Sequence, residues 1–308
     1  MTLSIMMMLR TLLHVAALLA LPPLVVGVVN RTKAIVAGRR GPPLLQAYFD
    51  LAKLLRKGAV YSRTTSWVFR AGPVVGLAAV ASAGLLLAMG GAPAPVSFAG
   101  DFVLFAYLLG LARFVTALAA LDTGSPFEGM GAAREVTFAS LAEPALFLCL
   151  LVLARATGTL SLSGMLGPAL PAAWGHAAPA LVLASIGLFV VALAENSRIP
   201  VDDPNTHLEL TMIHEVMVLD HGGPDLAFIL YGAALKLFLF GAIFSRLVLG
   251  HAAGALASEA LFFAGVLVFA VGVGLVESFM ARLRMIRVPQ LLVGASVLSA
   301  FALVLLLR

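Results

Sequence analysis

Ionisable side chains are concentrated in residues 195–225 of this 308-residue chain. The stretch carries seven of the 15 acidic residues: Glu195, Asp202, Asp203, Glu209, Glu215, Asp220 and Asp225. Apolar residues are interleaved with them, among them Leu208, Met212 and Val216. Carboxylates among apolar side chains near a membrane have raised proton affinities and can titrate near neutral pH. The stretch is therefore predicted to handle protons or to respond to a nearby redox reaction.

Three histidines in the same stretch, His207, His214 and His221, recur every seven residues and invite a metal-site interpretation. On an unbroken helix they would span about 21 Å, which is too far for one ion. His214 and Glu215 begin an HExxH pattern, but position 218 is Val218, so the zinc motif fails. The sequence therefore gives no support for a metal site here.

Three further charges, Arg113, Glu143 and Lys236, lie inside long apolar stretches. A charge in hydrocarbon costs a few kcal/mol and usually marks a function or a compensating pair. Arg113 and Glu143 are expected at similar depths in consecutive spans, which predicts an ion pair that is either structural or part of a relay. Lys236 has no partner within its own helix, and together with Glu195 it is predicted to relay protons or charge.

Composition excludes several classes of protein. The chain is 61% hydrophobic and 11% charged, whereas a soluble domain is about 25% charged. The single cysteine, Cys149, cannot form a disulfide within the chain. An iron–sulfur cluster needs about four thiolates, so any redox metal is expected in another subunit. The sequence contains no P-loop, nucleophile elbow or dinucleotide fingerprint.

The fold class predicted is an all-α integral membrane protein, one polytopic domain over residues 1–308, with about eight transmembrane helices. A span needs roughly 20 mainly apolar residues, and eight stretches qualify: 11–29, 68–90, 99–121, 136–157, 179–195, 226–248, 257–279 and 289–307. The first stretch lacks a small-x-small cleavage site, which favours a retained span over a signal peptide. Asp101 and Glu259 lie near the outer ends of their spans and are expected to be solvated.

The basic residues indicate the orientation. Fourteen of the 20 Lys and Arg residues lie in or beside the connections after spans one, three, five and seven: Arg31, Lys33, Arg39, Arg40, Lys53, Arg56, Lys57, Arg63, Arg70, Arg134, Arg198, Arg282, Arg284 and Arg287. The positive-inside rule places these connections in the cytoplasm and both termini on the outer side of a bacterial or archaeal cytoplasmic membrane. The net charge of +5 therefore reports topology, and nucleic-acid binding has no support.

The polar connections on the cytoplasmic side predict a docking surface there. Residues 43–57 place Leu44, Tyr48 and Leu51 at helical spacing, with Gln46, Asp50, Lys53 and Lys57 on the opposite face. This pattern predicts an amphipathic helix in the membrane interface, facing anionic lipid or a partner, or serving only as a positive-inside anchor. The preceding Gly41-Pro42-Pro43 favours a fixed turn. Residues 196–225 are predicted to form an acidic cytoplasmic loop.

Three motifs in order resemble one protein family. They are GRRGPPLLQAYFDLAKLLRK (38–57), DTGSPFEGMGAAREVTFASLAEP (122–144) and AENSRIPVDDPNTHLEL (194–210). The chain resembles subunit 1 of respiratory complex I, and within that family the membrane subunits of formate hydrogenlyase and hydrogenase-4 type group 4 [NiFe]-hydrogenases. IPVDDPNTHLEL replaces the acidic run typical of quinone-reducing members.

The resemblance implies a membrane-anchor and energy-coupling subunit without a cofactor of its own. Its expected partners are hydrogenase-like large and small subunits with the NiFe centre, iron–sulfur subunits, antiporter-like membrane subunits and lipid. The resemblance places Glu195, Arg198, Asp202 and Glu209 in the loop facing the redox module. It places Arg134, Glu135 and Glu143 in the segment that supplies charges to the membrane relay.

The resemblance also assigns the docking region. With the amphipathic pattern, it predicts that the redox module contacts Arg39, Arg40, Gly41, Pro42, Gln46, Asp50 and Lys53. The predicted proton relay comprises Glu143, Glu195, Asp202, Asp203, Glu209, Glu215 and Lys236, with Arg113, Arg134, Glu135 and Arg198 as structural or relay charges. No residue is predicted to be catalytic or to bind metal. Two alternatives stay open: a complex I subunit that helps to form a quinone-reduction site, and a stand-alone transporter.

Overall fold

The computed structural model describes residues 2–90, 93–203, 212–250 and 254–307, and these form an all-helical bundle without strands. The elements are α1 (Thr2–Ala20), α2 (Pro22–Val36), α3 (Gln46–Leu55), α4 (Trp67–Gly84), α5 (Asp101–Asp122), α6 (Pro126–Thr157), α7 (Leu162–Met165), α8 (Ala169–Glu195), the 3-10 turn η1 (Glu215–Val218), α9 (Gly223–Leu249), α10 (Ala255–Phe279), the 3-10 turn η2 (Met285–Arg287) and α11 (Val288–Leu305).

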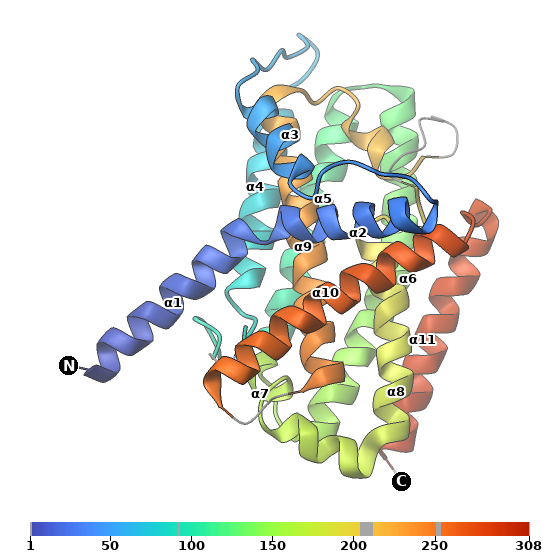
Figure 1. Cartoon of the computed structure of the whole chain (residues 1–308). Helices are drawn as coiled ribbons and strands as arrows, with labels where there is room; N and C mark the ends of the chain where they lie inside the picture. Colours follow the sequence, from blue (N-terminus) through green and yellow to red (C-terminus); the bar gives the residue numbers. More distant parts are fainter. Residues whose placement is uncertain (1, 91–92, 204–211, 251–253, 308) are drawn as a thin grey trace.

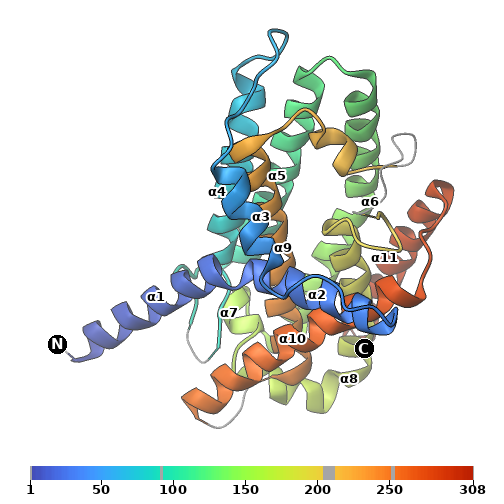
Figure 2. The same cartoon turned by 45° about the horizontal axis from the view of Figure 1, so that its top comes forward.

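The predicted membrane fold is confirmed. Seven helices of the described residues are long and apolar enough to cross a membrane, and the number is eight if the bent pair α1–α2 is one broken span. Figure 1 shows α4, α5, α6, α8, α9 and α11 running along the bundle, while α2 and α10 lie together across them. Figure 2 shows α1 projecting away from the other helices. The chain is thus a multi-pass membrane protein.

Small residues allow the helices to approach closely, as is common between membrane helices. A Cβ added at Gly72 of α4 would lie 2.9 Å from the Cβ of Ala119 in α5. A Cβ added at Gly274 of α10 would lie 2.8 Å from Thr32 of α2. In α9, 61% of the apolar window is buried, against 28–50% in the other single-helix spans. Helix α9 is therefore the central helix of the bundle.

The predicted first span, 11–29, is broken rather than continuous. α1 and α2 meet at 44° because Pro22 and Pro23 have no N–H to donate to the carbonyls of Leu18 and Leu19. The Tyr231 hydroxyl, from α9, contacts those two oxygens at 3.0 Å and 2.9 Å. The hydroxyl of Tyr48, on α3, donates to the carbonyl of Ala20. Tyr231 therefore contacts the carbonyls that the prolines leave without a donor, and Tyr48 caps the carbonyl of the last residue of α1.

The expected solvation of Asp101 is wrong, because its side chain is fully buried. Its Oδ1 accepts a hydrogen bond from the backbone N–H of Leu162 at 2.6 Å, and its Oδ2 accepts one from Phe98 N–H at 3.2 Å. The connection that contains α7 folds over the end of α5, and position along the span could not predict this covering.

We call the end of the bundle that carries α3, η1 and the connections after α2, α5, α8 and α10 the basic end. Helix α3 lies within the stretch predicted to be amphipathic and has no fully buried residue. The turn before it contains Gly41 at φ +65°, where a side chain would be strained. A Cβ added at Gly27 would lie 2.1 Å from the Leu44 carbonyl oxygen, so α2 approaches the start of α3 closely.

Candidate functional site

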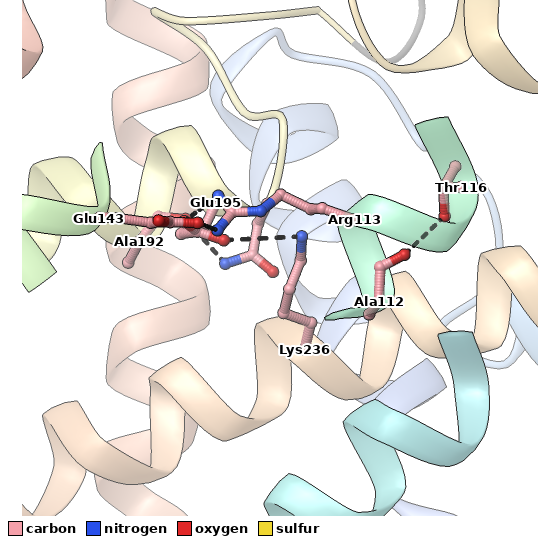
Figure 3. Close-up of polar contacts among 8 residues, drawn as sticks. Ala112, Arg113, Thr116, Glu143, Ala192, Glu195 and Lys236 are labelled. Atoms are coloured by element: carbon pink, nitrogen blue, oxygen red, sulfur yellow. Dashed lines mark hydrogen bonds and ion pairs between the residues drawn. The ribbon is translucent and has the colours of Figure 1, made fainter. Parts of the chain in front are cut away.

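Four ionisable side chains from four different helices meet inside the bundle: Arg113 of α5, Glu143 of α6, Glu195 of α8 and Lys236 of α9. We call them the charge cluster. Figure 3 shows the Arg113 guanidinium directed toward the two carboxylates, with the Lys236 ammonium approaching Glu195 from α9. These four residues are spread over more than 120 positions of the chain, so only the packing of the bundle brings them together.

Arg113 binds two carboxylates. Its Nη1 donates to Glu195 Oε1 and its Nη2 donates to Glu143 Oε1, both at 2.6 Å. The predicted Arg113–Glu143 ion pair is therefore present, but Glu195 is a second partner that the sequence did not indicate. The Glu195 side chain is completely buried, whereas the Glu143 side chain is 47% exposed. Because a buried carboxylate without a partner is strongly unfavourable, Arg113 stabilises Glu195 more than it stabilises Glu143.

Lys236 is the second cation of the charge cluster. Its Nζ lies 4.0 Å from Glu195 Oε2, and this oxygen is buried without a hydrogen bond among the described residues. The helix that carries Lys236 is the most enclosed of the single-helix spans. Two cations thus face the fully buried carboxylate, whereas among the described residues the ion pair of the more exposed carboxylate is with Arg113. A charge that changes at Glu195 is therefore felt at Arg113, and through it at Glu143.

Asp202 connects the charge cluster to the segment after α8. Its Oδ1 pairs with Arg282 Nη2 at 2.9 Å, and its Oδ2 accepts backbone N–H bonds from Ile213 at 3.3 Å and His214 at 3.0 Å. A cavity of about 20 Å³ lies between Asp202, Arg113, Glu135 and Glu195. That volume holds about one water molecule. A single water in this cavity would therefore bridge Asp202 or Glu135 to the charge cluster.

A second small cavity, of about 50 Å³, lies on another side of Arg113. Its polar wall consists of Arg113, Thr116, His214 and Lys236, and its apolar wall includes Phe228 of α9. Burial and the charge of Lys236 lower the pKa of His214 to about 4. At pH 7 His214 is therefore neutral, and one of its ring nitrogens can accept a proton.

A large cavity of about 580 Å³ lies at the basic end between α2, α3, α9 and the segments around Asp202 and His214. Its apolar walls include Leu51, Ile229 and Leu230. Its polar wall contains Asn30, Gln46, Asp50, Asn196, Ser197, Arg198, Asp202, His214, Glu215 and His221. Cavities of this size that combine apolar walls with a few polar groups are typical of small-molecule sites.

Other predicted relay residues lie around these cavities. Arg198 pairs with Glu277 Oε1 at 3.3 Å, and Lys33 pairs with Glu277 Oε2 at 2.7 Å, so α2, α10 and the segment after α8 are joined. Arg134 Nη1 donates to the Met212 carbonyl at 2.9 Å and ties α6 to the segment before η1. These contacts hold the walls of the large cavity in position.

The remaining predicted residues are dispersed. Glu215 lines the large cavity, the backbone N–H of Asp203 donates to Asp202 Oδ1, and Glu209 lies outside the described residues. Of the predicted docking residues, Arg39, Arg40, Gly41, Pro42, Asp50 and Lys53 are exposed and Gln46 is half-buried. Pro42, Gln46 and Asp50 also line the large cavity. None of these docking residues contacts either small cavity.

Sequence reasoning passed over His214, Arg282 and Glu277 as functional residues. His214 was tested only as a metal ligand, and Arg282 was counted only as a topology signal. Glu277 stands at the end of an apolar span, where a buried carboxylate demands a cation, and that signal could have identified it. The partners of all three lie in distant segments, so the sequence alone could not supply them.

Comparisons with known proteins agree with this architecture. The NADH dehydrogenase family model matches residues 8–308. Hydrogenase-4 component C of Escherichia coli K12 is 34% identical over 232 residues, which cover 75% of this chain and 72% of that protein. Formate hydrogenlyase subunit 4 of the same organism is 30% identical over 293 residues, which cover 93% of this chain and 94% of that protein.

A solved structure shares the fold. The structure of the membrane-bound sulfane sulfur reductase, an archaeal respiratory membrane complex, contains a chain that aligns with a TM-score of 0.81 and 22% sequence identity. The alignment covers 97% of this chain and 99% of that one. The arrangement of helices therefore extends over the whole length of both chains.

Proposed function

We propose a function from an established premise: the chain belongs to the NADH dehydrogenase family and is a membrane subunit of the hydrogenase-4 and formate hydrogenlyase type. In this proposal the chain anchors a hydrogenase-like redox module at its basic end. The basic end faces the cytoplasm, and both termini lie on the outer side of the membrane. The chain then transmits charge changes through the charge cluster to a neighbouring antiporter-like membrane subunit. The NiFe centre and the iron–sulfur clusters belong to partner subunits.

The observation that carries the proposal is the half-exposed Glu143. Its side chain is 47% exposed in a membrane-spanning helix while it is paired with the buried Arg113. An ionised carboxylate facing lipid costs a few kcal/mol, so such groups face a partner or water. A Cβ added at Gly110 of α5 would lie 3.6 Å from Glu143 Oε1, so the Glu143 carboxylate lies against α5 at this position. Tyr107 and Phe114, one turn before and after Gly110, are 68% and 59% exposed.

This exposed face, Tyr107, Phe114 and Glu143, has the composition of a contact with another membrane subunit, in which aromatic side chains surround one polar group. The partner would present a polar or protonatable group to Glu143. The buried part of the cluster would then connect this contact to Asp202 and the basic end.

The docking of a redox module is supported by the other exposed residues of the basic end. Phe49, Val60 and Trp67 are 61%, 86% and 77% exposed, close in sequence to the exposed cations Arg39, Arg40 and Lys53. Exposed aromatic and apolar residues among basic side chains are expected where a protein partner covers the surface. The same cations also suit anionic lipid at the rim of that contact.

Glu143→Gln tests the proposed relay. It should lower proton or sodium translocation about 100-fold, the lower end of the range for loss of a positioned proton-transfer group, while the complex still assembles and evolves hydrogen. Ion uptake by inverted membrane vesicles measures the first effect and hydrogen evolution the second. Ser140→Ala, at an exposed position on α6, is the matched control. Equal translocation in E143Q and S140A would disprove the relay role.

A second candidate role, part of a quinone-reduction site, is favoured by the cavity of about 580 Å³. In that case Leu51, Ile229 and Leu230 would contact an apolar tail, and Arg198, Asp202 and His214 would surround a polar head. Solvent extraction of the purified complex discriminates between the roles. The first role predicts no stoichiometric quinone and hydrogen turnover that resists quinone-site inhibitors. About one quinone per complex, with inhibitor-sensitive turnover, would establish the second.

A further inference from the structure

One ionisable residue of the described structure lines both the large cavity and the small cavity beside Lys236, and it is His214. The two other residues shared by these cavities, Ile229 and Ala233, are apolar. The large cavity lies at the basic end, and the cavity of about 50 Å³ contacts Arg113 and Lys236 of the charge cluster. A proton that moves from one to the other between these apolar walls has His214 as its available carrier.

His214 is held at this position by its backbone. Its N–H donates to Asp202 Oδ2 at 3.0 Å, and Asp202 is fixed by Arg282 at 2.9 Å. Its ring Nδ1 is buried without a hydrogen-bond partner among the described residues. Buried polar groups normally have partners, so this ring nitrogen is not committed to a structural hydrogen bond there and is available to take up or release a proton.

We infer that His214 transfers protons between the large cavity and Lys236, and so protonates the charge cluster from the basic end on the side of its second cation. This inference rests on the proposed coupling function and names the entry residue for it. The charge cluster would pass the proton on, whereas His214 would admit it.

The transfer balances without a redox step. A hydronium ion in the large cavity gives a proton to one ring nitrogen of His214, which leaves water and an imidazolium. The other ring nitrogen releases its proton to water in the small cavity, and the hydronium formed there protonates the neutral amine of Lys236 and becomes water again. Lys236 is neutral after it has given a proton to Glu195, whose Oε2 lies 4.0 Å away. Each step breaks one O–H or N–H bond and forms another.

Charges around His214 make the protonation of His214 and that of Lys236 alternate. The ionisable groups that line these two cavities with His214 are Lys236 of α9, Arg113 of α5, Asp50 of α3, Asp202 and Arg198 after α8, and Glu215 and His221 of its own segment. Beyond these walls, Arg134 and Glu135 of α6, Glu195 of α8 and Arg282 lie on segments that contact the Asp202–His214 region. Burial, followed by the Lys236 ammonium, lowers the pKa of His214, and Asp202 opposes this effect. When Lys236 loses its proton, the imidazolium becomes easier to form. His214 then accepts a proton just when Lys236 can receive one.

Chemical rescue tests the inference in membranes that contain the assembled complex. His214→Ala opens space beside a cavity of about 580 Å³, which imidazole can enter. The variant should translocate protons about 100-fold more slowly, in the range for loss of a positioned proton carrier. Added imidazole should restore translocation at least about tenfold. Pyrazole, which has the same ring size but is a much weaker base, should not.

His221→Ala is the matched control. His221 lines the large cavity and stacks on Phe69 with ring centroids 3.9 Å apart, but it lines neither small cavity. We expect added imidazole to leave proton translocation by the H221A variant unchanged. Equal rescue of H214A by imidazole and pyrazole would assign His214 a space-filling role and overturn the inference. If H214A does not assemble, His214→Gln, which keeps hydrogen bonding but not basicity, must show the same loss.

Glu143→Gln, measured in parallel, separates the two proposals. Loss of translocation in E143Q with normal translocation in H214A or H214Q would overturn the inference and leave the proposed function intact. Normal translocation in all three variants would overturn both.

Discussion

Replacing Arg113 by leucine is expected to remove most of the assembled complex from the membrane. Arg113 is 8% exposed and binds Glu195, whose side chain is completely buried. Removing one partner of a buried ion pair costs about 3–5 kcal/mol, which is comparable to the whole stability of many proteins. The Lys236 ammonium, 4.0 Å from the other oxygen of Glu195, compensates only in part. The amount of complex on native gels measures the loss.

Second-site changes show which carboxylate depends on Arg113. Because the Glu195 side chain is fully buried and that of Glu143 is 47% exposed, R113L/E195Q should recover more complex than R113L/E143Q. The simple expectation from the sequence, one pair with Glu143, predicts the reverse order. Equal recovery in the two double variants would show that neither carboxylate is specifically destabilised.

Replacing Asp202 by alanine is expected to abolish ion translocation and loosen the segment between α8 and α9. The change removes an ion pair with Arg282 and the acceptor of two backbone N–H bonds, those of Ile213 and His214. Hydrogen bonds to a charged group contribute about 1.5–3 kcal/mol each. Translocation should fall about 100-fold or more, to near the limit of detection, as is typical when a positioned proton-transfer group is lost, because His214 is no longer fixed between the cavities.

Two measurements check the role of Asp202. Limited proteolysis of vesicles whose basic end is accessible should cut D202A faster within residues 196–221 than the unmodified protein. Asp220→Asn is the control, since it neutralises an exposed carboxylate of the same segment. If D202A and D220N resist protease equally and translocate equally, Asp202 does not position His214.

The sequence by itself determined the membrane architecture. Runs of about 20 apolar residues can be stable only in hydrocarbon or in a protein core, so the spans followed from local composition. The basic connections after alternate spans followed in the same way, because the cost of charge in lipid depends on residue type rather than on distant contacts. The same argument identified Arg113, Glu143 and Lys236 as unusual residues.

The tertiary structure alone decided which of these residues act together. Glu195 binds Arg113 across 82 positions of the chain, and no local pattern encodes a contact between helix faces. Asp101 became buried because a distant connection covers it, and the bend at Pro22 and Pro23 is accommodated because Tyr231 of α9 reaches the carbonyls of Leu18 and Leu19. His214 gained its candidate role only when packing placed it between two cavities. Burial and pairing depend on how all the helices pack, whereas hydropathy belongs to each segment separately.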